Sequence, residues 1–96
     1  MHFLEALRDR VRRGEITCSV RIWQRPHVKV GGRYALPPGQ IEVDAVIPIQ
    51  LADITRALAR KSGFRDVADL LATAKHGAGE SVFLIHFHYV PPKRRR

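Results

Sequence analysis

The sequence has a single cysteine among its 96 residues, so no disulfide can form within one chain. Its beginning, MHFLEALRDRVRR, has no uncharged apolar run of the kind that a signal peptide carries. No segment approaches the ~18 consecutive apolar residues that cross a membrane. These absences predict a cytoplasmic protein with no membrane span and no stabilising disulfide.

Acidic residues are also scarce, because nine Asp and Glu stand against seventeen Lys and Arg, which gives a net charge of +8. The last six residues, PPKRRR, carry four of the positive charges, and without them thirteen basic residues still face nine acidic ones. An excess of this size favours polyanionic partners, chiefly nucleic acid, although a basic surface can also serve solubility alone. Arginine outnumbers lysine here, and arginine suits phosphate better than lysine does.

The length and the hydrophobic content of 45% predict one small folded domain with one core. The domain is expected over 1–91, and the basic residues 92–96 are expected to form a disordered tail. No internal repeat is visible. The tail can add affinity for nucleic acid that does not depend on sequence.

Apolar spacing, together with the positions of glycine and proline, predicts the secondary structure. The expected order is helix 2–13, strand 16–23, loop 24–32, strand 33–36, turn 37–40, strand 41–49, helix 52–62 capped by Asp53, helix 66–75 and strand 81–90. In strand 41–49 the five apolar odd-numbered residues are expected to share one face. Short connections favour antiparallel pairing, so the predicted fold class is α+β: a small, mostly antiparallel β-barrel of four or five strands with flanking helices.

The segment ITCSVRIW, residues 16–23, alternates between two kinds of side chain. The even positions are apolar and predict the buried face, where Cys18 is expected to pack as a small hydrophobe. The odd positions are Thr17, Ser19, Arg21 and Trp23. A guanidinium and two hydroxyls on rigid strand positions can hold a phosphate or the polar edge of a base, and an indole can stack on a base. The spacing alone leaves open the alternative of an exposed strand face with scattered polar groups.

A family resemblance runs through the same region. In GEITCSVR, Gly14 and Arg21 stand at the spacing of the motif G-x-K-x-x-x-x-R, with Ile16 in the lysine position. Three further segments fit the same family pattern in the same order: RIWQRPHVKVGGRYAL, ARKSGFRDVADLL and SVFLIHFHYV. Over nearly the whole chain the sequence therefore resembles the ASCH domain, a branch of the PUA-like superfamily.

That resemblance implies a β-barrel with a central cleft and a role in RNA binding. One small bacterial branch of the family hydrolyses N4-acetylcytidine with a lysine, a threonine and a glutamate. The lysine falls on Ile16, the threonine falls on Ser19, and the segment RALARKSGF, which matches the glutamate's helix, offers no carboxylate. A hydroxyl nucleophile needs a base to take its proton, so Ser19 is only a weak catalytic candidate and enzymatic activity stays uncertain.

The leading interpretation is an RNA-binding module that recognises RNA or a nucleotide-like ligand in a basic cleft, without a cofactor. The expected binding residues are Gly14, Thr17, Ser19, Arg21, Trp23 and Tyr34. One alternative is a nucleoside- or RNA-directed hydrolase with altered catalytic residues. Another is an accessory module that binds a protein partner, which a narrow apolar cleft would favour.

His86 and His88 stand two residues apart on one face of the last strand, a spacing that can ligate a metal. The sequence shows neither a Cys-x-x-Cys motif nor a third ligand beside them. They are therefore interpreted as polar residues on a solvent-exposed or cleft-lining face, and no metal site is predicted.

Overall fold

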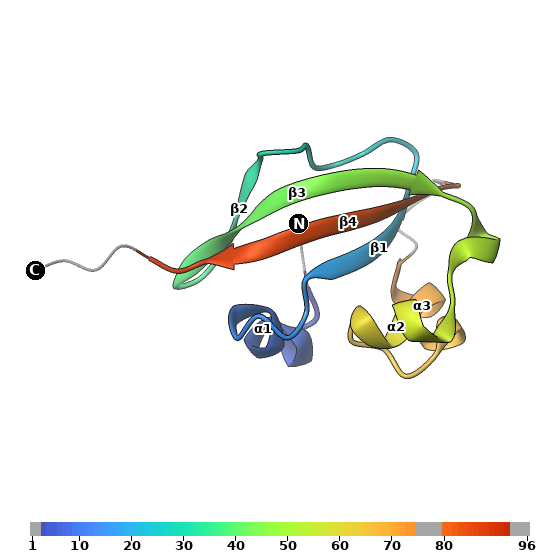
Figure 1. Ribbon diagram of the computed structural model, residues 1–96, viewed down its shortest axis with the longest axis horizontal. Coiled ribbons are helices and arrows are strands. Elements are labelled where there is room, and N and C mark those ends of the chain that lie inside the picture. The colour runs from blue at the N-terminus through green and yellow to red at the C-terminus, as the bar shows by residue number, and fades with distance from the viewer. Residues whose placement is uncertain (1–2, 75–79, 93–96) are drawn as a thin grey trace, which may run out of the picture.

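The computed structural model describes residues 3–74 and 80–92 (Figure 1). The elements are α1 (Glu5–Arg12), β1 (Cys18–Trp23), β2 (Arg33–Leu36), β3 (Gly39–Ile49), the short 3-10 helix η1 (Leu51–Asp53), α2 (Arg56–Lys61), α3 (Val67–Ala74) and β4 (Ser81–Val90). This is the predicted order with η1 added. The described residues include no helix that is long and apolar enough to span a membrane. The basic end, 93–96, lies outside the described residues, so the predicted division between domain and tail stays a prediction.

The four strands form one antiparallel sheet in the order β1-β4-β3-β2. The sheet curls into half a barrel, and the helices gather on the β1 side of it (Figure 1). The predicted α+β class and the antiparallel sheet are thereby confirmed. The closed barrel is not found, because β1 and β2 form the two edges and do not pair with each other in the described part of the chain.

Strand β1 is buried along its whole length, and each of its faces belongs to a different hydrophobic cluster. The first cluster lies on the sheet face of Phe87, here called the Phe87 face, and the segment at Phe3 packs onto it. The second lies on the opposite face, called the His88 face, where α2 and α3 pack. The prediction that only the even positions of this strand are buried is wrong, because both faces are covered.

A β-bulge at Asp44 changes which residues of β3 face each cluster. The pairs around it are Val43–Phe87, Ala45–His86 and Val46–Ile85. Before the bulge, Ile41 packs into the first cluster as expected. After the bulge, Val46 takes the Phe87 face and Ile47 turns to the other face, where it is 41% exposed. The expectation that the odd-numbered residues of 41–49 share one face therefore fails in the second half of the strand.

The predicted helix over 52–62 divides into η1 and the shorter α2. Asp53 does not cap α2; its carboxylate instead accepts a hydrogen bond of 2.8 Å from the backbone N–H of Gln50 within η1. The N-cap of α2 is Thr55, whose hydroxyl accepts from the N–H of Leu58 at 3.1 Å. Both residue types are good caps, and the spacing of apolar residues did not distinguish them.

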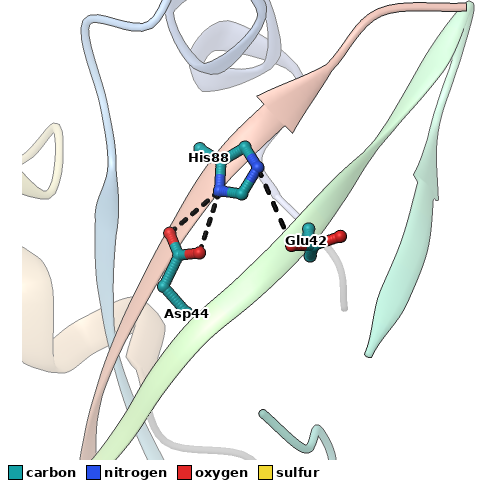
Figure 2. Close-up of side chains that lie close together, drawn as sticks. All are labelled: Glu42, Asp44 and His88. Atoms are coloured by element: carbon teal, nitrogen blue, oxygen red, sulfur yellow. Dashed lines mark hydrogen bonds and ion pairs between the residues drawn. The ribbon is translucent and has the colours of Figure 1, made fainter. Parts of the chain in front are cut away.

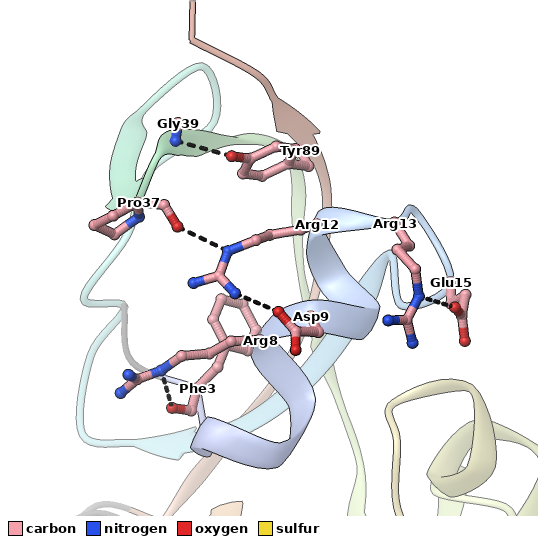
Figure 3. Close-up of polar contacts among 9 residues, drawn as sticks. All are labelled: Phe3, Arg8, Asp9, Arg12, Arg13, Glu15, Pro37, Gly39 and Tyr89. Atoms are coloured by element: carbon pink, nitrogen blue, oxygen red, sulfur yellow. Dashed lines mark hydrogen bonds and ion pairs between the residues drawn. The ribbon is translucent and has the colours of Figure 1, made fainter.

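Tyr89 ties the end of β4 to the turn that precedes β3, because its hydroxyl accepts a hydrogen bond of 2.8 Å from the N–H of Gly39 (Figure 3). We expect Tyr89→Phe to lower the free energy of unfolding by about 1 kcal/mol, since this partly buried N–H loses its acceptor. Urea unfolding measures the loss. Tyr34→Phe is the matched control, because its hydroxyl accepts from the N–H of Lys29 at the exposed surface. Equal losses in the two variants would contradict the prediction.

Candidate ligand-binding site

A cavity of about 140 Å³ opens beside β1, where α1, α2 and α3 approach one another. Its lining residues are Phe3, Leu4, Leu7, Ser19, Val20, Arg21, Ser62, Phe64, Thr73 and Ala74. Most of these side chains are apolar, and the polar ones are three hydroxyls and one guanidinium. A cavity of roughly this size has room for a single ring of the size of benzene.

Arg21 and Ser19 form one wall of the cavity. They are two residues apart on β1 and therefore project from the same face of the strand. The Arg21 Nε donates a hydrogen bond of 2.9 Å to the Ser19 hydroxyl, and the guanidinium carbon lies 5.4 Å from the centre of the Phe3 ring. Both residues are 7% exposed. The cation is thus held in a fixed position against an aromatic face.

Burial sets the electrostatics of this wall. Desolvation lowers the pKa of Arg21 to about 10, because a charged guanidinium loses the stabilising interaction with water. At neutral pH the group is still protonated. A cation in such surroundings interacts with an acceptor more strongly than it would in water.

A second groove, of about 340 Å³, adjoins the cavity at Phe64, which lines both. Its other lining residues are Arg10, Arg60, Gly63 and Arg65. We call this surface the arginine groove. Among the described residues, the ion pairs of Arg10 and Arg65 are long, at 3.5 Å to Glu15 and 3.6 Å to Asp69. The three arginines come from α1, α2 and the segment before α3, so no local spacing in the sequence revealed them.

Three other arginines, Arg8 and Arg12 on α1 and Arg13 at its C-cap, serve the fold itself (Figure 3). Their partners are the Phe3 carbonyl for Arg8 at 3.2 Å, the Pro37 carbonyl for Arg12 at 2.7 Å and the Glu15 carboxylate for Arg13. The hydrogen bond from Arg13 holds the pKa of the Glu15 carboxyl below its ordinary value. These contacts fix α1 against the turn between β2 and β3 and against its own following loop.

The remaining predicted site residues lie away from the cavity. Thr17 is exposed just before β1, and Gly14 is exposed after α1 with a positive φ of 77°. Trp23 is buried, and its ring stacks on His27 at 4.6 Å between centroids. Tyr34 is half-buried on β2 and packs against the first cluster. Of the six predicted residues, the structure brings Ser19 and Arg21 together at the cavity.

The chemistry available at Ser19 follows from the same lining. Its hydroxyl oxygen accepts from Arg21, and among the described lining residues no carboxylate, imidazole or amine is present to take its proton. The thiol of Cys18, the residue before Ser19, is the other nucleophilic group nearby. It is buried, and its sulfur lies 3.7 Å from the Ser62 hydroxyl oxygen. The arrangement favours binding through hydrogen bonds and charge.

Comparison with known proteins gives no match: no family model, no curated protein and no solved structure is similar to this chain. The resemblance to the ASCH domain therefore stays a prediction from the sequence.

Proposed function

We propose that this protein binds single-stranded RNA, with one unstacked base in the cavity beside Arg21 and neighbouring phosphates on the arginine groove. The observation that carries the proposal is this adjacency: a ring-sized cavity with a buried guanidinium and a groove lined by three arginines share Phe64 as a lining residue. Because the two hollows meet at Phe64, the proposal places a base in the cavity and phosphates of the same strand on the arginine groove.

The cavity suits a base better than it suits a phosphate. Its apolar walls can sandwich a planar ring, and the polar groups of Arg21 and Ser19 can meet the ring's hydrogen-bonding edge. A phosphate, by contrast, would lose its hydration among the apolar side chains. Recognition of RNA commonly relies on a base removed from its stack and held in this way.

The charge of the whole chain supports the same proposal. A net charge of +8 attracts a polyanion from a distance, and arginine can bind phosphate through two parallel hydrogen bonds. The proposal takes the half-barrel as a PUA-like fold of the ASCH type on the strength of the sequence resemblance, and it assigns the protein to the cytoplasm.

Arg21→Met tests the base-binding cavity. We expect affinity for a short single-stranded RNA to fall by about 1–3 kcal/mol, because methionine fills similar space without a hydrogen-bond donor or charge. Fluorescence anisotropy across a salt series measures this loss. Arg56→Ala is the matched control, because Arg56 is exposed on α2 and lines neither the cavity nor the arginine groove.

A chain ending at Pro92 completes the comparison. We expect it to bind with a flatter salt dependence and little other change, because the removed charges act without sequence preference. If truncation abolishes binding and Arg21→Met leaves it unchanged, the cavity is not the RNA site. In that case turnover of N4-acetylcytidine by the purified protein would favour the hydrolase, and binding of an apolar peptide would favour the accessory module.

A further inference from the structure

A second group of side chains gathers on the His88 face of the sheet, at the end of β4. There β3 and β4 are paired so that Glu42 lies directly opposite His88. The bulge leaves Asp44 without a partner of its own in β4, and its carboxylate reaches the same imidazole. Two carboxylates that the sequence does not place near His88 are thus brought to it by strand pairing.

The imidazole of His88 lies between the two carboxylates (Figure 2). Its Nδ1 is 2.9 Å and 3.0 Å from the two carboxylate oxygens of Asp44. Its Nε2 is 3.9 Å from Oε2 of Glu42. One donor atom from each residue lies within 4.8 Å of the others. In a tetrahedral site with ligand distances of about 2.0–2.2 Å, donor atoms lie roughly 3.3–3.6 Å apart, so side-chain rotations must bring the three donors about 1 Å closer together.

Charge and the surrounding residues also favour a cation. Two carboxylates lie on either side of one imidazole, and a bound cation offsets their combined negative charge. Arg33 donates to Oε1 of Glu42 at 2.9 Å, which orients that carboxylate and leaves Oε2 turned toward His88. Outer partners of this kind fix the direction of a metal-binding carboxylate. The side chains of Asp44 and His88 are 47% and 48% exposed, so an ion can enter from solvent and keep water ligands.

We propose that Glu42, Asp44 and His88 bind a divalent transition-metal ion of the zinc class. An imidazole nitrogen with carboxylate oxygens suits Zn²⁺, Co²⁺ or Mn²⁺, whereas Ca²⁺ and Mg²⁺ prefer oxygen ligands alone. β3 supplies two carboxylate ligands that the sequence does not place beside His88, and His86 is not part of the group. The site is independent of the RNA proposal, because none of its three residues lines the cavity or the arginine groove.

The test is titration of untagged, chelator-stripped full-length protein with ZnCl₂ by calorimetry, repeated with Co²⁺ and followed by visible absorption. We expect one ion per site, with His88→Ala weakening binding roughly tenfold or more. His86→Ala is the matched control, because His86 lies on the same face of β4 but outside the group of three. Zn²⁺ is also expected to raise the thermal midpoint of the native chain and of His86→Ala, but not of His88→Ala.

Glu42→Gln provides a second variant of nearly unchanged shape, in case the His88 substitution disturbs folding. It should also weaken zinc binding, because an amide oxygen is a poorer ligand than a carboxylate. The proposal is overturned if the native chain shows no saturable zinc binding. It is equally overturned if His88→Ala and Glu42→Gln bind zinc as the native chain does, because the group is then an ion-pair network only.

Discussion

Replacing Phe87 by alanine is expected to lower the free energy of unfolding by about 3–5 kcal/mol, the largest single loss anticipated for this chain. Phe87 is among the largest fully buried side chains and lies on β4, which pairs with both β1 and β3. Its ring packs against Phe3 with 5.3 Å between centroids. Alanine would leave a cavity that the neighbouring strands cannot close. Because a domain of this size is stable by only about 5–15 kcal/mol, the loss is a large share of the total.

Urea unfolding followed by fluorescence measures this loss, and Phe87→Leu is its control. Leucine keeps most of the buried volume, so it should cost less than about 1.5 kcal/mol. The Phe3 ring, which packs on Phe87, also lies against the guanidinium of Arg21. If Phe3 shifts in the alanine variant, Arg21 loses this support, so Phe87→Ala should weaken RNA binding even where the protein stays folded. A loss for alanine no greater than that for leucine would contradict the packing argument.

Gly63→Ala is expected to cost about 2–4 kcal/mol, for two separate reasons. Gly63 has a φ of 96°, a conformation that side chains with a Cβ rarely adopt. An added Cβ would also lie 2.8 Å from Ile16 Cδ1 and 2.8 Å from Leu7 Cδ2. The methyl ends of these two side chains, one on α1 and one just before β1, would have to move to admit the alanine.

Gly14→Ala separates the two reasons, because Gly14 has a φ of 77° and nothing within 4 Å of an added Cβ. It should show only the conformational cost, about 1–2 kcal/mol. Equilibrium unfolding of both variants gives the difference, which reports the crowding at Gly63 alone. If the two glycines cost the same, the contact between α1 and the end of α2 is looser than described.

Regular alternation made β4 the most predictable element of the fold. Its bounds match the predicted 81–90, and its odd- and even-numbered residues pack into the two expected environments. Strand β1 shows where the same reasoning fails. Ser19 and Arg21 are polar, so their face was expected to be free of the core. They are buried because Phe3, which precedes β1 by fifteen residues in the sequence, covers that face.

The alternation of polar and apolar residues along the chain gave no sign of the bulge in β3. Asp44 continues the polar positions of the strand, and only the pairing with β4 shows that one residue is left over. A bulge depends on the register of two strands that are separated by 31 residues of chain, 50–80. Its consequence, the approach of Asp44 and Glu42 to His88, was equally hidden from the sequence.

The candidate sites divide in the same way. Spacing of two residues on a strand was enough to place Ser19 beside Arg21. The arginine groove combines residues from three separate segments, which only the tertiary fold brings together. Sequence reasoning therefore found the part of the site built from one strand, and it missed the part built from tertiary contacts.

The order of strands in the sheet bears on how the chain folds as it is synthesised. β4, the last strand in sequence, is the central partner of β1, the first. Until residues 81–90 have left the ribosome, β1 has no strand to pair with, and β3 lacks its longer neighbour. Contacts between such distant segments make folding slow compared with that of local structure. The exposed apolar strands of the nascent chain must therefore be kept from aggregation until nearly the whole domain has been made.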